Sequence, residues 1–424
     1  MASEFWLGSA LQGLVALGSL LWAELVRDGR HALAHAFPRL MPKHHLHHKI
    51  FRRDLTVIDA DLYRQSQWHH DVPESVAMLL AGLLLCGTLW LIAPTYSLAS
   101  GLGVLYSLSF LVGGMSRGQG IAMETDLTHQ PGAFTDIPGL WWVNRSYHWR
   151  HHFDDPNAYF SGTFTLLDRL MGTSLSLKGK TVAVTGASGS LGRALLQQLL
   201  QQGCKVIPLS RGSQPISLPM DGGSQQLEPH RWQIGQENEL TPLLQTVDIL
   251  ILNHGVNVHG GRSADAIEQS FQVNTFSSWR LLELFLATVT SNPDIACKEV
   301  WVNTSEAEVL PAISPLYELS KRALGDLVTL RRLEAPCIIR KLILGPFRSQ
   351  LNPIGVMSAD WVARQIIAQA KRDFRNIIVT INPLTYLIFP LKETLVSGYF
   401  RLFSHAPKPS ITPTPDPPQP IKST

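Results

Sequence analysis

The sequence predicts an all-α membrane domain followed by an α/β domain with a doubly wound parallel sheet. Three observations lead to this fold class. Long apolar segments fill much of roughly the first 120 residues, histidines cluster after the first of them, and strand patterns alternate with helical patterns from about residue 178 onward. The length of 424 residues allows two or three domains, and a net charge of only +3 gives no indication of a nucleic-acid partner.

Three apolar segments are long enough to cross a bilayer. The first is residues 6–26, and the uncharged stretch 75–115 breaks softly at APTYS, which predicts a hairpin of two spans at about 76–94 and 97–115. The first span lacks the basic start and small-residue exit of a cleaved signal peptide. Because Lys and Arg are frequent in residues 27–53, the positive-inside rule predicts an integral membrane protein with its histidines and second domain on the cytosolic side.

Histidines recur at metal-binding spacings after the spans. One pair is four residues apart and two triplets repeat the pattern H-x-x-H-H, so on a helix each set would aim its rings at one point. These eight candidate ligands are His31, His35, His44, His47, His48, His148, His151 and His152. Neutral imidazole is the commonest metal ligand, and a structural zinc takes only four ligands. Eight imidazoles therefore indicate two metal ions, and nitrogen ligands with open positions favour iron that activates O₂.

The order of these boxes between hydrophobic segments resembles the membrane fatty acid hydroxylase / sterol desaturase superfamily. The segment 158–173, AYFSGTFTLLDRLMGT, is similar to the end of that family's catalytic domain, so the resemblance assigns residues 1–175 to a histidine-box di-iron domain. It implies two iron ions that hydroxylate or desaturate a C–H bond of a membrane lipid, with His129 as a further ligand. The other histidines of this half match no box position and are expected around the site or at the surface: His45, His69 and His70.

A glycine-rich turn opens the second domain, which the sequence places at residues 178–376. A β-branched strand precedes Gly186, Gly189 and Gly192 and a helical pattern follows them, as in a Rossmann-like fold. Such glycines allow the backbone to approach a pyrophosphate at the helix N-terminus. The next strand ends at Arg211, where a site selective for NAD(H) would place Asp or Glu, so NADP(H) is favoured as the cofactor. Alternatively, Arg211 is a solvated loop charge.

Residues suited to chemistry on a carbonyl group follow. Tyr317 and Lys321 are one helical turn apart, so the lysine cation would lower the pKa of the phenol and let it exchange a proton near neutral pH. The pair lies about 130 residues after the glycine turn and twelve after Ser305, which resembles the short-chain dehydrogenase/reductase family. The resemblance implies Tyr317 as the acid/base, Lys321 holding the tyrosine and the ribose, and Ser305 on the substrate. It also implies that Asn274 takes part in the proton relay.

The same resemblance implies a set of cofactor contacts around the glycine turn and the strands beside it. They are Gly186, Ser188, Gly189, Leu191, Gly192, Arg211, Asn253 and Gly255. One residue departs from the family pattern, because Glu306 stands where a second serine is frequent. A degenerate, weakly active reductase is therefore the alternative to a competent one.

Together these features predict a bifunctional membrane oxidoreductase that modifies a lipid. The iron centre would hydroxylate or desaturate a fatty acyl, sterol-like or related lipid, and the second domain would interconvert the resulting alcohol with a carbonyl. Because a nicotinamide passes a hydride whereas iron with O₂ needs single electrons, the iron centre requires an external donor such as ferredoxin or a b-type cytochrome. Two alternatives stay open: aldehyde-to-hydrocarbon chemistry of the wax-forming type, and a membrane-anchored scaffold that binds NADP(H) or a lipid through a degenerate dehydrogenase.

Three segments carry no predicted chemistry. Residues 212–229 are polar and rich in Gly and Pro, which predicts a loop between strands. Residues 377–404 are broken by Pro and charge, which favours an interfacial membrane-docking segment over a fourth span. The Pro-rich tail, residues 405–424, is predicted to be disordered.

Overall fold

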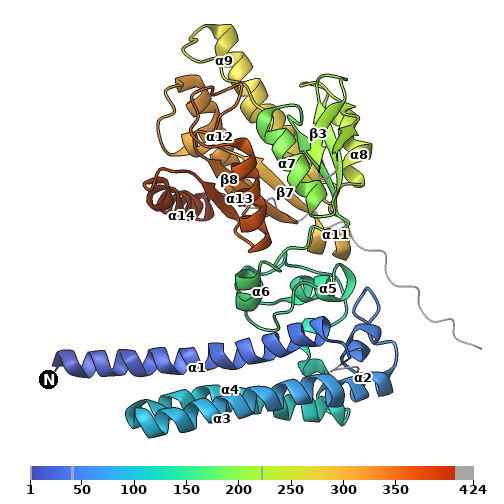
Figure 1. Ribbon diagram of the computed structural model, residues 1–424, viewed down its shortest axis with the longest axis vertical. Coiled ribbons are helices and arrows are strands. Elements are labelled where there is room, and N and C mark those ends of the chain that lie inside the picture. Colours follow the sequence, from blue (N-terminus) through green and yellow to red (C-terminus); the bar gives the residue numbers. More distant parts are fainter. Residues whose placement is uncertain (1, 40–42, 221–222, 406–424) are drawn as a thin grey trace, which may run out of the picture.

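The computed structural model describes residues 2–39, 43–220 and 223–405, so nearly all of the tail predicted at 405–424 lies outside the described residues. Three layers follow one another along the longest axis of the molecule (Figure 1). Long apolar helices lie at one end, short helices and loops in the middle, and the α/β domain at the other end. This architecture confirms the predicted order of a region of apolar helices followed by a Rossmann-like domain with a parallel sheet.

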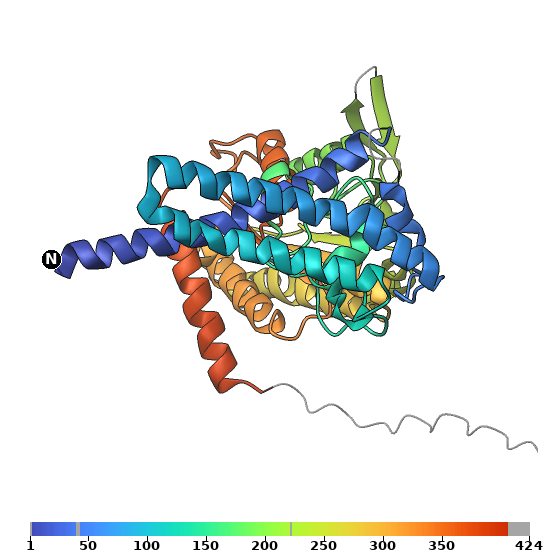
Figure 2. The ribbon, with the colours of Figure 1, turned by 90° about the horizontal axis from the view of Figure 1, so that it is seen from below.

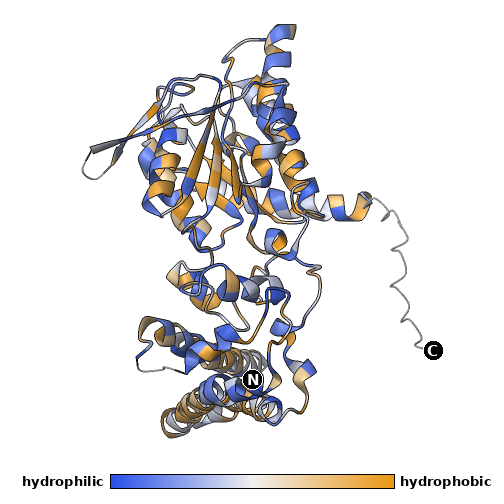
Figure 3. Cartoon of the chain, turned by 90° about the vertical axis from the view of Figure 1, so that its right-hand side faces the viewer, coloured by the Kyte–Doolittle hydropathy of each residue, from blue (hydrophilic) through white to orange (hydrophobic). Residues whose placement is uncertain are grey.

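Three helical segments of the first layer are long and apolar enough to cross a membrane. They contain α1 (Ala2–Ala36), then α2 (Ala60–Ser66) continued by α3 (Val72–Ile92), and α4 (Pro94–Gly118). The long helices run side by side in Figure 2, and apolar residues line them in Figure 3. They cover the three predicted spans, but α1 continues to Ala36, beyond the predicted end at residue 26. Its last turns therefore carry the first histidine pair.

α1 and α4 approach each other closely where a glycine faces a serine. The backbone N–H of Gly103 donates to Ser19 Oγ at 3.0 Å, and a Cβ atom on Gly103 would lie 2.6 Å from the Ser19 carbonyl oxygen. Small residues at such crossings allow the van der Waals packing that holds membrane helices together. By contrast, a Cβ atom on Gly101 of the same helix would meet no atom within 4 Å.

The middle layer is organised around the buried carboxylate of Asp168. Asp168 accepts hydrogen bonds from the backbone N–H groups of Phe160 and Ser161, both at 2.9 Å. The hydroxyls of Thr173 and Tyr147 donate to it at 2.6 and 2.8 Å. Asp168 therefore connects its own helix, a loop and the helix that carries the last histidine box. The short elements of this part are η1 (His44–Lys49), η2 (Gln67–Asp71), η3 (Met123–Thr125), η4 (Leu127–His129), α5 (Arg145–Phe153) and α6 (Leu166–Met171).

The α/β domain is built on a seven-stranded sheet with the strand order β5-β2-β1-β6-β7-β8-β9, all parallel. The strands are β1 (Thr181–Thr185), β2 (Lys205–Ser210), β5 (His230–Arg231), β6 (Ile249–Leu252), β7 (Glu299–Asn303), β8 (Ile338–Leu344) and β9 (Asn376–Val379). One face packs on α7 (Ser190–Gln201) and α13 (Ala359–Lys371), and the other on α10 (Ser278–Leu286) and α12 (Pro315–Arg331). The strand order reverses between β1 and β6, and ligands of such folds bind at the carboxyl ends of the strands there.

The prediction of a loop at residues 212–229 is wrong. β3 (Ile216–Met220) and β4 (Gly223–Leu227) form an antiparallel pair there, and Ile216 and Leu218 are buried in the core. Alternating burial of these residues is a strand signal that the Gly and Pro around them obscured. The remaining elements are η5 (Glu237–Leu240), α8 (Thr241–Gln245), α9 (Ala264–Phe271), η6 (Gln272–Ser277), α11 (Asn292–Cys297), η7 (Glu306–Glu308) and α14 (Thr385–Phe403).

The α/β domain meets the middle layer at the amino ends of its strands. Lys180, just before β1, donates from Nζ to Asp154 at the end of α5, over 2.6 Å. Asn292, the first residue of α11, accepts from the backbone N–H of Phe134 at 2.8 Å, and α11 packs on α5. Figure 1 shows α11 between the sheet and α5. The carboxyl ends of the strands therefore face away from the histidine-bearing layer.

Replacing Gly103 by Ala is expected to destabilise the helix bundle by about 1–3 kcal/mol, because the added methyl forces α1 and α4 apart. The matched control is Gly101→Ala, which gains the same helix propensity in open space. The measurement is the midpoint of heat-induced loss of monodisperse protein in detergent, which should fall for Gly103→Ala alone. Equal midpoints for the two variants would show that the close crossing contributes nothing to stability.

Candidate functional site

Histidines from α1, η1, η2, η4 and α5 gather in one place, next to the ends of the apolar helices. Their donor atoms form three groups, each within 4.8 Å: His31, His35, His48 and His151; His47, His129, His148 and His152; and His31, His44 and His70. All nine histidines predicted as ligands belong to these groups. The structure therefore brings together residues up to 121 positions apart in the sequence, from His31 to His152.

The ring nitrogens face one another at distances that suit a shared ion. The Nε2 atoms of His31 and His151 are 2.8 Å apart, and His129 Nε2 lies 3.0 Å from His148 and 3.1 Å from His152. Two nitrogens bound at about 2.0–2.1 Å to one ion lie roughly 3 Å from each other. The spacing thus fits one ion in each group of four histidines.

Other groups orient two of the rings. His129 Nδ1 pairs with Asp126 Oδ1 at 2.8 Å, and the hydroxyl of Tyr63 donates to the same carboxylate at 3.0 Å. His151 Nδ1 pairs with the carbonyl oxygen of Ala158 at 2.8 Å. A histidine held this way at one nitrogen presents the other to a metal, which is the usual arrangement of bound histidines. Sequence spacing alone assigned no role to Asp126, although it precedes His129 by three residues.

Burial keeps most of these imidazoles neutral. Burial and the neighbouring histidines together lower the pKa of His48 to about 2. Burial also places the pKa values of four others well below their ordinary value: His47, His148, His151 and His152. Among the described residues, five buried ring nitrogens have no hydrogen-bond partner: His47 Nε2, His48 Nδ1, His70 Nε2, His148 Nδ1 and His152 Nδ1. His48, His148 and His152 face the cluster through Nε2, so of these five atoms only His47 Nε2 and His70 Nε2 are candidate ligands. Neutral rings and an all-nitrogen donor set fit transition-metal ions.

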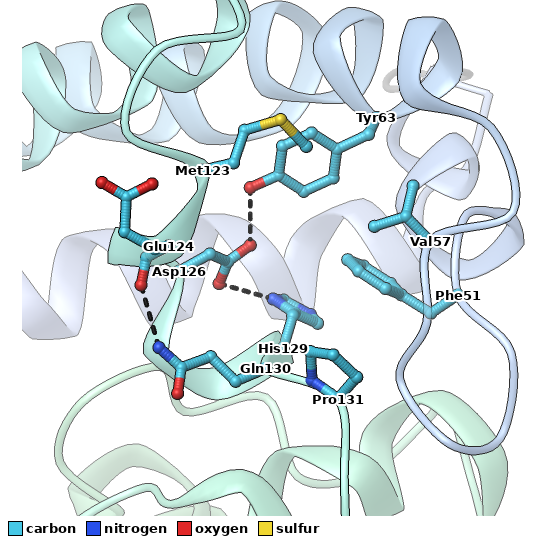
Figure 4. A pocket seen from close by; sticks show the side chains of 9 residues that line it. All are labelled: Phe51, Val57, Tyr63, Met123, Glu124, Asp126, His129, Gln130 and Pro131. Carbon is cyan, nitrogen blue, oxygen red and sulfur yellow. Dashed lines mark hydrogen bonds and ion pairs between the residues drawn. The ribbon is translucent and has the colours of Figure 1, made fainter. Parts of the chain in front are cut away.

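A cavity of about 380 Å³ opens beside this cluster (Figure 4). The ring of Phe51 stacks on that of His129 with 4.2 Å between their centres, and Val57 and Met123 add apolar surface. Asp126 and Tyr63 form a polar wall on the other side. Of the group that contains His129, His47, His148 and His152, the cavity is lined by His129.

The histidines outside the boxes divide into two kinds. His45 is exposed and His69 is half-buried, as expected for residues without a box position. His70 is only 4% exposed and groups with His31 and His44, which the box spacing did not predict. It comes from η2, at the start of the second span, so its distance in sequence hides its place in the cluster.

The glycine turn after β1 leaves the start of α7 open to an anion. Gly186 has a φ of +63°, and a Cβ atom on Gly192 would lie only 2.2 Å from the Gly186 carbonyl oxygen. Gly189 is the N-cap of α7, and no side chain caps the helix there. The N–H groups of this first turn point outward with the positive end of the helix dipole, so they can bind a pyrophosphate.

The other predicted cofactor contacts surround the turn, with one exception. Ser188 and Arg211 are exposed, and Asn253 and Gly255 follow the carboxyl end of β6. The side chain of Leu191 is only 3% exposed and packs in the core. The predicted contact of Leu191 with the cofactor can therefore involve only its backbone, because the periodicity of α7 turns the side chain toward the sheet.

The four predicted catalytic residues meet at the carboxyl end of β7. Ser305 follows this strand with a left-handed φ of +72°, and its hydroxyl hydrogen-bonds the phenol of Tyr317. Lys321 Nζ lies 5.9 Å from the centre of the Tyr317 ring. A Cβ atom on Gly255 would lie 3.1 Å from Asn274 Oδ1 and 4.0 Å from Lys321 Nζ, so Asn274 is beside them. This group can exchange a proton with a hydroxyl or carbonyl oxygen.

The expected effect of Lys321 on Tyr317 is wrong in this structure. Burial raises the pKa of Tyr317, and the Ser305 hydroxyl, not the lysine, lowers it. Lys321 Nζ instead donates to the carbonyl oxygen of Asn303 at 2.7 Å. Burial also lowers the pKa of Lys321 to about 8, so its side chain loses its charge as the pH rises through this value.

Glu306 departs from the family pattern without disturbing Ser305. Its Oε1 accepts a hydrogen bond from Thr380 Oγ1 at 3.0 Å and another from the hydroxyl of Thr385. Thr385 is the first residue of α14. The carboxylate therefore connects the loop after β7 to α14, a contact that sequence spacing could not reveal.

Comparisons with known proteins cover different lengths of the chain. Residues 182–312 match the NAD dependent epimerase/dehydratase family. A monoglucosyldiacylglycerol epimerase of Synechocystis sp. is 55% identical over 402 residues, which cover 93% of this chain and 98% of that protein. A short-chain dehydrogenase of Aspergillus ruber is 32% identical over 149 residues, or 32% of this chain and 42% of that protein. The crystal structure of a short-chain dehydrogenase from Burkholderia cenocepacia in complex with NADP covers 55% of this chain and 100% of its own at 18% identity, with a TM-score of 0.43.

The affinity for NADPH is expected to fall as the pH rises through about 8. Lys321 is protonated below its pKa of about 8 and neutral above it, and only the ammonium form attracts an anionic nucleotide. Well above the pKa the loss should reach about tenfold per pH unit at most. Fluorescence titration of NADPH binding from about pH 6.5 to about pH 9.5 measures it. Lys321→Arg stays charged in this range and should bind with little pH dependence; equal pH dependence in both proteins would exclude Lys321 as the cause.

Proposed function

The chain belongs to the family of the Synechocystis monoglucosyldiacylglycerol epimerase, and we propose that it inverts one hydroxyl-bearing carbon in the glucosyl headgroup of a membrane diacylglycerol lipid. The observation that carries the proposal is the identity of 55%, which extends over both the membrane half and the α/β half. Inversion of a carbinol carbon requires a group that removes and returns the hydroxyl proton. Ser305, Tyr317 and Lys321 form such a group beside the glycine turn.

The side chains divide the work of this reaction. NADP(H), when bound, supplies reversible hydride transfer at the substrate carbon, and Arg211 favours it over NAD(H) through its 2′-phosphate. Tyr317 takes the hydroxyl proton during oxidation and gives a proton back to the carbonyl oxygen during reduction. Ser305 donates a hydrogen bond to the same sugar oxygen and lowers the pKa of Tyr317, while protonated Lys321 attracts the anionic nucleotide. Between the two steps the oxidised sugar presents its other face to the hydride donor, which inverts the carbon. Because the hydride removed in the first step is returned in the second, the net reaction consumes no electrons.

α14 supports a position of this site at the membrane surface. Two of its charged residues face the domain, where Lys392 Nζ donates to Glu308 at 2.7 Å and Glu393 accepts from Lys341 at 2.8 Å. Leucines on its other side are 72%, 61% and 64% exposed: Leu387, Leu391 and Leu395. Figure 2 shows α14 directed across the long axes of α1, α3 and α4. If those helices cross the membrane, α14 lies along its surface, which we assign to the cytosolic side, and docks the α/β domain on the lipid.

The histidine cluster favours a second function in the membrane half, namely O₂-dependent oxidation of a lipid C–H bond. This function rests on geometry alone: two groups of four histidines, half of them buried, beside a cavity. Two bound iron ions would supply O₂ activation there, and an external one-electron donor such as ferredoxin or a b-type cytochrome would supply electrons. The chain's own contribution is to hold and orient the ligands, as Asp126 does for His129. Epimerisation needs neither O₂ nor a donor, so the two halves would carry separate reactions.

Purified protein with NADP(H) is expected to convert monoglucosyldiacylglycerol to a lipid with an epimeric hexose. Substrates deuterated at each ring carbon in turn should keep the label in the product, because the same nicotinamide removes and returns it. Tyr317→Phe should lower turnover by about 10²–10⁴-fold and still bind NADPH, while Tyr399→Phe, an exposed tyrosine of α14, should behave as wild type. Mass spectrometry and NMR of the headgroup measure the outcome. An unchanged headgroup, or turnover retained in Tyr317→Phe, would refute the proposal.

The detergent-purified chain is expected to hold about two iron ions, measured by elemental analysis. His47→Ala/His48→Ala removes one ligand from each group of four and should lose them. The control is His45→Ala in the same segment, which changes an exposed ring and should keep both ions. No metal, or a single tightly held zinc, in the wild type would contradict the two-iron centre.

A further inference from the structure

We propose that His70 is a tenth histidine ligand of the metal centre, oriented by the carboxylate of Asp71. The inference rests on the proposed metal centre and extends it to a residue outside every histidine box.

The position of His70 inside the cluster is the first support. Its donor atom forms a group with those of His31 and His44 within 4.8 Å. Its ring lies parallel to that of His47 with 4.2 Å between the centres, and 4.7 Å from that of His44. Because His31 and His47 belong to different groups of four, His70 contacts a histidine of each group.

The polar contacts of His70 match those of a bound histidine. Its Nδ1 pairs with Asp71 Oδ1 at 3.1 Å, whereas its buried Nε2 has no hydrogen-bond partner among the described residues. His129 shows the same pattern, with Nδ1 on Asp126 and Nε2 toward the cluster. A carboxylate on one ring nitrogen fixes the tautomer and increases the basicity of the other, which is the usual second contact of a histidine on a metal.

The local backbone explains how this residue reaches the cluster. η2, which contains His70, is a π-helical turn inserted between α2 and α3. Such turns add a residue to a helix and are frequent at functional sites. Here the turn leaves His69 half-buried, with Lys43 Nζ 3.3 Å from its ring, and directs His70 inward. The break from regular helix therefore has a visible result, namely the placement of one imidazole.

A buried carboxylate beside His70 also indicates a cation. Glu74 is only 3% exposed and lies 3.6 Å from His70 Nε2 and 4.0 Å from His31 Nδ1. Its Oε1 has no hydrogen-bond partner among the described residues, and Arg30 is 3.7 Å away. Two divalent ions held only by neutral imidazoles leave their whole charge uncompensated. Glu74 and Asp71 supply negative charge where it would be needed.

The test compares His70→Ala with His69→Ala in the full-length, detergent-purified protein. Both variants remove an imidazole from the same turn, but only His70 faces the cluster. We measure metal content per chain, cobalt affinity in competition with a chelator, and the absorption spectrum of the cobalt-loaded protein, which reports the number of ligands. His70→Ala should lose one of two ions or bind cobalt at least about tenfold more weakly, with an altered spectrum. His69→Ala should match wild type.

Further measurements keep the outcomes distinct. NADPH binding by the α/β domain shows whether a variant is folded. If His70→Ala does not fold, Asp71→Asn keeps the imidazole and should still weaken cobalt binding by about 10–100-fold. His70→Ala indistinguishable from His69→Ala, with the ions lost only in His47→Ala/His48→Ala, overturns the role of His70 and leaves the metal centre intact. Wild-type protein that binds no metal overturns both.

Discussion

The buried carboxylate of Asp168 is the interaction on which the arrangement of both sites depends. A carboxylate removed from water is costly unless donors surround it, and here two backbone N–H groups and two hydroxyls do so. One donor, Tyr147, sits on α5 directly before His148, and another, Thr173, directly precedes Ser174, whose N–H bonds to Lys371 of the α/β domain. A single side chain thus fixes the last histidine box and the start of the second domain relative to each other.

The sequence predicted those parts of the protein whose signal is local. Three apolar segments, the H-x-x-H-H spacing, the glycine turn and the Tyr317–Lys321 pair each lie within a short stretch, and the structure brings their residues together as expected. Contacts made across the fold were not accessible in this way. Glu306 bonds to Thr385 79 positions later, and His70 enters the cluster through a π-helical turn that no spacing rule marks. At Leu191 the family position predicts a cofactor contact, but helix periodicity buries the side chain and leaves only the backbone for it.

The two halves combine different kinds of chemistry in one chain. The membrane half offers neutral nitrogen donors in a buried cluster, while the α/β half offers exchangeable protons beside an open helix N-terminus. Sugar epimerisation has no net change of oxidation state, so it needs only the groups of the α/β half. The histidine cluster therefore requires its own explanation, because without an ion His47 Nε2 and His70 Nε2 have no hydrogen-bond partner among the described residues.

The orientation of the sheet has a consequence for how lipids are handled. The amino ends of the strands rest on the histidine layer, and the group of Ser305 and Tyr317 lies past their carboxyl ends. Among the described residues, the body of the α/β domain therefore stands between the two sites. A lipid handled at both would then have to leave one, mix with the bilayer pool and diffuse laterally to the other. Their fluxes would then be linked by membrane composition and not by direct hand-over of an intermediate.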